Sequence, residues 1–220
     1  MQMTSFLMPA AGVLSLVVIG TAALAQTRNI GWDELSGPTT PIENPFETLS
    51  NAQMDRLAQL LRLDMLATED GDTEAATQAK VMRGEFTAEG IDADFLFAER
   101  LRIMAQLQAE STASNPEIIG ESIRLPGYLL PLEMEGEKAV EFLLVPTVGA
   151  CIHTPPPPAN QIVRVSYPDG FPAEGFYTPI WITGALEEEL VRQSLFMVDG
   201  DTEVDVTYQM KAETVELYEY

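Results

Sequence analysis

The sequence predicts an α+β protein in which N-terminal helices pack on a small five-stranded antiparallel β-barrel. The expected barrel is like the oligonucleotide/oligosaccharide-binding (OB) type. Apolar residues follow a helical spacing within residues 47–110 and alternate as in strands within residues 121–220. The first expected strand contains Pro126-Gly127, which indicates the kink that closes a small sheet. An antiparallel β-sandwich is the alternative, because residues 167–178 form a loop where the OB type usually has a helix.

Residues 1–25 have the features of an export signal peptide. Residues 6–25 are apolar or small, and Ala23-Leu24-Ala25 fits the small-x-small pattern that precedes a cleavage site. An uncleaved membrane anchor is the alternative, because the apolar run is nearly long enough to span a bilayer. The polar residues after Ala25 favour cleavage there. We therefore expect a periplasmic protein with no stable membrane insertion after cleavage.

Residues 26–46 predict an extended arm on the domain surface, with Trp32 and several prolines. A helix follows in the region 47–110. Ser50 stands as its N-cap three residues before Gln53, and apolar residues continue at helical spacing to Met65.

Two further segments complete the helical region. Residues 69–78 are acidic and alanine-rich, which indicates either a loop or a solvated helix. A second helix is expected to start near Asp92. Its buried face would carry Phe97, Leu101, Met104 and Ala105. We expect the methionines of these helices to fill the core.

Five strands are expected in the C-terminal half, at residues 122–133, 139–145, 162–167, 180–183 and 204–212. Residues 139–145 are nearly all apolar, which predicts a central strand. Residues 186–197 interrupt the strands with a helix-like pattern, in which Leu186, Leu190 and Val191 stand among glutamates.

The formal net charge of -22 limits the partners of this chain. Such acidity repels phosphate backbones and anionic lipids, so nucleic acids and membrane surfaces are disfavoured. The acidity is compatible with attraction of cations, although most of these charges are expected simply to solvate the surface. The single cysteine excludes an internal disulfide bond.

The candidate site is the loop that holds the only cysteine and the only histidine, Cys151 and His153. In extended backbone these two side chains share a face. Together they suit a transition metal such as zinc or copper, or a thiol activated by an imidazole. The loop also contains residues that we expect to shape it or to contact a partner: Gly149, Pro155, Pro156, Pro157, Pro158, Asn160 and Gln161.

The loop residues have distinct expected roles. Gly149 allows a sharp turn, and the four prolines favour a stiff polyproline II segment. Asn160 and Gln161 are expected to pin the far end by hydrogen bonds to backbone. A metal needs further ligands beyond Cys151 and His153, from carboxylates, a second subunit or a partner. In the structural alternative Cys151 is buried and the loop is only a rigid crossover.

Several strings resemble a bacterial family of envelope proteins, the domain of unknown function 3299 family. They are Pro126-Gly127-Tyr128-Leu129-Leu130-Pro131-Leu132-Glu133, Glu141-Phe142-Leu143-Leu144-Val145-Pro146, Val148-Gly149-Ala150-Cys151-Ile152-His153 with Pro155–Pro158 and Asn160-Gln161, and Pro179-Ile180-Trp181-Ile182-Thr183-Gly184. Thr147 departs from the aromatic residue expected there. The resemblance implies an exported accessory protein that accompanies ABC-transporter components, in some cases in systems linked to zinc supply. It implies no established activity, and an enzyme is not the expected class.

Overall fold

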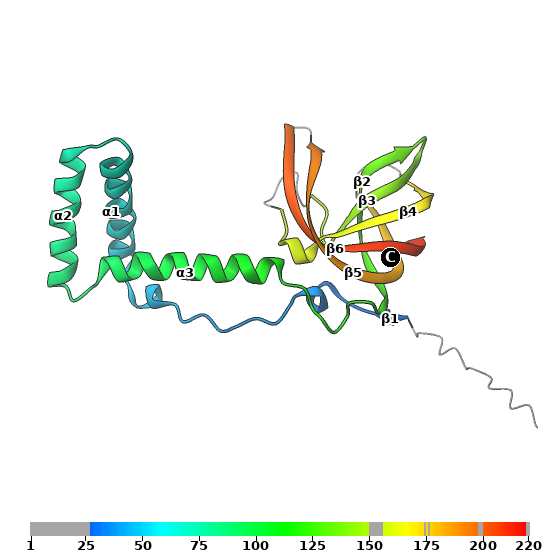
Figure 1. The fold of residues 1–220 in the computed structure, drawn as a ribbon, viewed down its shortest axis with the longest axis horizontal. Coiled ribbons are helices and arrows are strands. Elements are labelled where there is room, and N and C mark those ends of the chain that lie inside the picture. Colours follow the sequence, from blue (N-terminus) through cyan, green and yellow to red (C-terminus); the bar gives the residue numbers. More distant parts are fainter. Residues whose placement is uncertain (1–26, 150–155, 174, 176, 198–199, 219–220) are drawn as a thin grey trace, which may run out of the picture.

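The structure is a computed structural model that describes residues 27–149, 156–173, 175, 177–197 and 200–218. Within these residues the chain forms a helical region and a closed barrel, which one long helix joins (Figure 1). The expected signal peptide lies outside the described residues. None of the described helices has the length and apolarity needed to cross a membrane.

The helical region begins as the sequence predicts. Its helices are α1 (Asn51–Glu69), α2 (Thr73–Ala88) and α3 (Ala93–Thr112). The Ser50 hydroxyl accepts a hydrogen bond from the Gln53 N–H, and the Gln53 side chain accepts one from the Ser50 N–H, so the capping box is confirmed. The acidic stretch 69–78 contains the start of α2, where Asp72 is the N-cap.

The core of the helical region is small, and α3 contributes little to it beyond its first turn. The buried residues of this core are Leu57, Leu60, Ala79, Phe86, Ala93 and Leu96. The expectation that Leu101, Met104 and Ala105 face a core is wrong, because all three are exposed. Past its first turns α3 extends beyond α1 and α2 toward the barrel, so no neighbouring helix covers that face (Figure 1).

The C-terminal half closes into a five-stranded barrel. Its strands are β2 (Ser122–Glu135), β3 (Lys138–Val145), β4 (Val163–Pro172), β5 (Thr178–Met197) and β6 (Gly200–Leu217). A short strand of the arm, β1 (Arg28–Asn29), lies beside them. The order β2-β3-β4-β6-β5 closes because β5 also pairs with β2, while β1 adds a short parallel pairing to β2. The barrel prediction is confirmed, and the sandwich alternative is wrong.

The prediction of a wholly antiparallel barrel is wrong, because β4 and β6 are parallel. The reason is geometric. Strand directions around a closed ring can alternate throughout only when the number of strands is even. With five strands in the ring, at least one neighbouring pair must run in the same direction.

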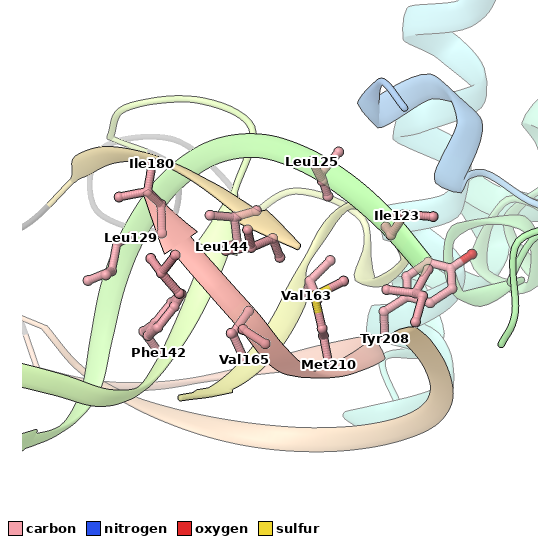
Figure 2. Packing of buried hydrophobic residues seen from close by; sticks show 14 of the residues in the cluster. Ile123, Leu125, Leu129, Phe142, Leu144, Val163, Val165, Ile180, Tyr208 and Met210 are labelled. Carbon is pink, nitrogen blue, oxygen red and sulfur yellow. The ribbon is translucent and has the colours of Figure 1, made fainter. Parts of the chain in front are cut away.

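Apolar side chains fill the barrel interior, among them the aromatic rings of Phe142 and Tyr208 (Figure 2). The alternation of β2, β3 and β4 sends Leu125, Leu144 and Val165 inward, and each is fully buried. Tyr208 of β6 is also fully buried, and its hydroxyl donates a hydrogen bond to the main-chain oxygen of Leu35. The arm before α1 is therefore part of the core as well as the surface.

A second buried cluster lies on the other face of β3. Leu143 and Val145 belong to it, together with Leu195, Val204 and Val206 from the distal half of the β5–β6 hairpin. Because β3 is buried on both faces, nearly all its residues are apolar, as the prediction of a central strand requires.

The helix-like interpretation of residues 186–197 is wrong, because these residues belong to β5 and pair with β6. A bulge explains the misleading spacing: Glu188 to Val191 spans one residue more than its partner segment, Tyr208 to Val206. Leu186 therefore faces the barrel interior, whereas Leu195 faces the second cluster. The extra residue turns a period of two into an apparent helical spacing.

Candidate functional site

The candidate loop leaves the barrel at the end of β3 and returns at the start of β4. Cys151, His153 and Pro155 lie outside the described residues. Gly149 has φ of 81°, as the expected sharp turn requires. Pro158 has φ of -52° and ψ of 149°, close to polyproline II. Pro156 and Pro158 are exposed, while Pro157 is half-buried.

Asn160 anchors the returning end of the loop against α3. It lies in a short 3-10 helix, η3 (Ala159–Gln161), and is 3% exposed. Its amide nitrogen donates hydrogen bonds of 2.8 Å to the main-chain oxygen of Glu110 and 2.9 Å to that of Ala113. Carbonyls in the last turn of a helix lack intrahelical partners, so Asn160 provides a donor to the Glu110 carbonyl and shares the Ala113 carbonyl with the Gly37 N–H. The expectation that Asn160 pins the loop is confirmed.

Gln161 anchors the same end of the loop to the arm. Its amide nitrogen donates a hydrogen bond of 2.8 Å to the main-chain oxygen of Trp32 and one of 3.1 Å to the Ser36 hydroxyl. Trp32 begins the 3-10 helix η1 (Trp32–Leu35) of the arm. The second expected pin is therefore confirmed, and its partner is a residue 129 positions earlier in the chain.

Trp32 in turn is fixed on the kinked strand β2. Its indole nitrogen donates a hydrogen bond of 2.7 Å to the Pro126 carbonyl. A Cβ at Gly127 would lie 2.9 Å from a ring carbon of Trp32 and 2.7 Å from the side chain of Leu144. Only glycine fits between the indole ring and the barrel core at this point. The Pro126-Gly127 motif thus binds Trp32 to the barrel: Pro126 accepts its hydrogen bond, and Gly127 leaves room for its ring.

Tyr208 holds the arm from the interior side. Besides its bond to Leu35, its hydroxyl accepts a hydrogen bond of 2.7 Å from the Asn115 N–H, and the Asn115 side chain donates one of 2.8 Å to the Glu34 carbonyl. Burial raises the pKa of Tyr208 above its ordinary value, although the bond from Asn115 opposes the change. The arm, the α3–β2 linker and the barrel are therefore joined at one buried phenol.

A small pocket lies where the loop leaves the barrel. Its volume is about 190 Å³, and its lining is Trp32, Pro126, Gly127, Tyr128, Pro146, Pro179 and Tyr218. Pro146 is the first residue after β3, so the outgoing end of the loop forms one wall. Trp32 therefore contacts the site at both ends of the loop: its ring lines this pocket, and its carbonyl binds Gln161.

A larger pocket of about 560 Å³ shares Pro179 with the first and lies between the diverging ends of β4 and β6. Phe171 and Tyr177 are among its lining residues. Tyr177 has φ of 68°, a left-handed conformation that costs energy for a residue other than glycine. Such outliers cluster at binding sites, which favours a binding role for this rim.

Trp181 lies beside these pockets on β5. Its ring centroid is 5.3 Å from that of Tyr218, and the Arg124 guanidinium carbon lies 4.4 Å from the Trp181 ring centroid. Arg124 also pairs with Glu216 at 2.8 Å. Trp181 is half-buried and alternates with the fully buried Ile180 and Ile182, so it lies on the outer face of β5.

The described surroundings bear on which chemistry the loop could perform. The residues that line the small pocket include aromatic rings, prolines and phenol oxygens, but no carboxylate. Within the described ranges no three His, Cys, Asp or Glu side chains are grouped to hold a metal.

The interpretation of Cys151 as a catalytic thiol would need a group that orients His153. Among the loop residues Asn160 carries an amide of the kind that such a role requires. Its side chain is instead buried against the end of α3, with its amide nitrogen bonded to two main-chain carbonyls. The geometry gives Asn160 a structural role and does not support the orienting role.

Sequence reasoning missed the aromatic part of this site. Tyr128, Tyr218 and the ring of Trp32 meet only because β2, the C-terminus of β6 and the arm converge on one end of the barrel. A usable signal was present at Pro126-Gly127, since a glycine within an apolar strand often marks close approach of another group.

Comparisons with known proteins identify a family and structurally similar proteins. A family model described as a protein of unknown function (DUF3299) matches residues 32–217. Among solved structures, the chain is similar to a DUF3299 family protein from Pseudomonas aeruginosa PAO1, with 25% sequence identity and a TM-score of 0.47. That alignment covers 89% of this chain and 98% of the other. No curated protein matches the chain.

Proposed function

The chain belongs to the DUF3299 family, and from this premise we propose that it is an exported accessory protein that binds a partner in the bacterial envelope. The observation that carries the proposal is that Trp32 lies at both ends of the Cys151–His153 loop. The hydrogen bond from Gln161 to the Trp32 carbonyl fixes the returning end of the loop, and fixing a binding segment in advance lowers the entropic cost of binding. The partner we propose is a component of an envelope ABC-transport system.

The chemistry of the pocket supports a protein partner. Aromatic rings and prolines line it, and surfaces of this kind bind apolar or proline-containing peptide segments. Tyrosine and tryptophan supply large contact areas while their polar atoms remain available for hydrogen bonds. Val148 follows the pocket-lining Pro146 by two residues and is 62% exposed, so it adds apolar surface on the loop itself.

Photo-cross-linking in the bacterial envelope tests this role. A benzoyl-phenylalanine at Val148 should cross-link a transport component, identified by mass spectrometry. The same probe at Met134, which is 42% exposed in β2, is the control. In the Val148 chain, Trp32→Phe should weaken the cross-link, because the pocket loses its indole. Equal products from both positions, or none that belongs to a transporter, would contradict the proposal.

A transition metal at the loop is the second candidate, favoured by the spacing of Cys151 and His153. The thiolate and the imidazole would supply two ligands for zinc or copper(I), and the partner would supply the others. Purified protein should bind either metal more weakly after Cys151→Ala/His153→Ala. Met65→Ala/Met104→Ala is the matched control, because exposed thioethers also attract copper(I). Equal metal binding by wild type and the Cys151/His153 variant would remove the metal from the proposal.

Export itself has a direct test. The protein recovered from the periplasm should begin at Gln26, because the Ala23-Leu24-Ala25 motif directs cleavage after Ala25. N-terminal sequencing and fractionation measure both points. A chain that keeps Met1 and stays with the membrane would support the alternative, an uncleaved anchor.

A further inference from the structure

The helical region carries large apolar side chains that nothing in the described structure covers. On α3 Leu101 is 64% exposed, and Met104 and Leu107 are each 51% exposed. They follow at intervals of three residues, so they occupy neighbouring positions on the surface of the helix. Scattered exposed apolar residues need no explanation, but a row on one helix marks an interaction site.

A similar row runs along α1. Met54 is 40% exposed and Met65 is 49% exposed, with half-buried Leu61 and exposed Ala58 between them. The spacing of these four residues alternates between four and three, which places them on one face of α1. The buried side of α1, with Leu57 and Leu60, points toward the small core instead.

The arm already occupies the opposite side of α3. Arg102 donates a hydrogen bond of 3.2 Å to the Glu43 carbonyl, and Gln106 donates one of 2.8 Å to the Thr40 carbonyl. With about 100° between successive helical residues, Gln106 points nearly away from Leu101 and Met104. In Figure 1 the arm follows one side of α3, while α1, α2 and the β5–β6 hairpin rise on the other side.

The shape and spacing of this surface select a helix as the occupant. Rows at intervals of three and four residues are the ridges into which a second helix packs. The row from Leu101 to Leu107 extends about 9 Å along α3, so it offers nearly two turns of contact. Methionine side chains adapt to varied apolar partners, as in proteins that bind amphipathic helices.

The negative charge of the helical region favours a partner helix that carries basic residues. Residues 47–112 contain 13 acidic and 6 basic side chains. Three of the basic residues are already in ion pairs within the region: Arg56, Arg83 and Arg102. A second copy of this chain would bring the same negative excess, whereas Lys and Arg beside an apolar face would be attracted.

We propose that the exposed apolar row of α3, formed by Leu101, Met104 and Leu107, binds an amphipathic helix of a partner protein, with Lys and Arg flanking its apolar face. This surface is separate from the barrel-end pocket, so an experiment can disprove this proposal without disproving the proposed function, and the reverse.

The test uses synthetic peptides as probes. One peptide of roughly 18 residues places Leu at helical spacing and Lys elsewhere; a second replaces Lys by Glu, and a third scrambles the first. Fluorescence anisotropy with the full-length mature protein should show that only the Leu/Lys helix binds well. Leu101→Gln/Met104→Gln should weaken it about tenfold or more.

The controls distinguish specific binding at this face from non-specific binding to exposed apolar side chains. Val81 is 60% exposed on α2, outside both rows, so Val81→Gln should leave the affinity within about twofold. Circular dichroism should show unchanged folding of all variants, because the substituted side chains are exposed. Equal affinity for the Leu101/Met104 variant, or for the Leu/Glu or scrambled peptide, would overturn the proposal. Sedimentation equilibrium that shows a wild-type dimer, lost in that variant, would identify a second copy as the occupant and overturn it too.

Discussion

The side-chain amide of Gln161 donates a hydrogen bond of 2.8 Å to the main-chain oxygen of Trp32, and this contact joins the returning end of the loop to the arm. The indole of Trp32 then lines the pocket from which the same loop departs. Two residues far apart in the chain thus define the base of the candidate site. The four predictions below test the contacts that hold this base, and the helical region, in place.

Gly127→Ala should destabilise the protein. The added Cβ would lie within 3 Å of Leu144, Trp32 and the Val145 carbonyl, and overpacking of this kind costs about 1–3 kcal/mol. Urea unfolding followed by circular dichroism measures the change. Gly84→Ala is the matched control, because a Cβ at this position of α2 meets nothing within 4 Å. That variant should gain about 1 kcal/mol. Equal effects of the two substitutions would contradict the prediction.

Asn160→Ala should loosen the junction of α3 with the barrel. The Glu110 carbonyl loses its side-chain donor, while the Ala113 carbonyl keeps only the bond from the Gly37 N–H, and the stability should fall by about 1–3 kcal/mol. Hydrogen exchange should speed up in the last turn of α3. Gln108→Ala, an exposed change on the same helix, serves as the control. Unchanged exchange in the Asn160 variant would show that the amide does not cap α3.

Tyr208→Phe should reduce the loss of stability in alkali. Burial raises the pKa of Tyr208 in the folded state, so its favourable contribution is complete below the unfolded pKa of about 10. It is lost as the pH rises through the folded pKa. Urea unfolding between pH 8 and pH 11.5 should therefore show a shallower decline for the variant. At pH 8 the variant should be less stable by about 1–2 kcal/mol, because Leu35 and Asn115 lose a hydrogen-bond partner.

Tyr167→Phe controls for the removal of a phenol elsewhere in the barrel. It should retain the wild-type decline in alkali. A Tyr208 variant with the same pH profile as the wild type would argue against a buried, hydrogen-bonded phenol at this position.

Arg83→Gln should weaken the packing of the helical region. From α2 its guanidinium donates hydrogen bonds of 2.8 and 2.7 Å to both oxygens of Asp64 on α1, and one of 2.9 Å to Asp94 on α3. A bidentate ion pair stabilises a protein more than an ordinary surface pair does. After allowing for solvent screening, we expect the free energy of unfolding to fall by about 1 kcal/mol. The exposed Arg62→Gln should change the stability by less than half as much. A reversed ranking in thermal unfolding would be inconsistent with the bridge.

The local features of this fold were readable from the sequence. The Ser50 cap, the alternation of the strands and the doubly buried β3 all depend on neighbouring residues, and the structure confirms them. The sequence predicted that Asn160 and Gln161 form hydrogen bonds to backbone, because amide side chains often do so in loops. It did not predict that their partners are Glu110 and Trp32.

Other features depended on residues far away. The bulge in β5 gave residues 186–197 a helical spacing, and only pairing with β6 shows that they form a strand. The spacing of Leu101 and Met104 identified one face of α3, but whether a neighbour covers that face is decided elsewhere in the chain.

By itself the sequence determined the α+β class, most of the strands, the start of α1 and the loop that holds Cys151 and His153. The tertiary structure alone decided that β4 and β6 run parallel, that α3 leaves an apolar row uncovered and that aromatic side chains gather at the base of the loop. Side-chain periodicity is set by backbone geometry within a few residues, so it can be read locally. Chain closure and burial depend on segments that meet only after folding, and no local pattern specifies them.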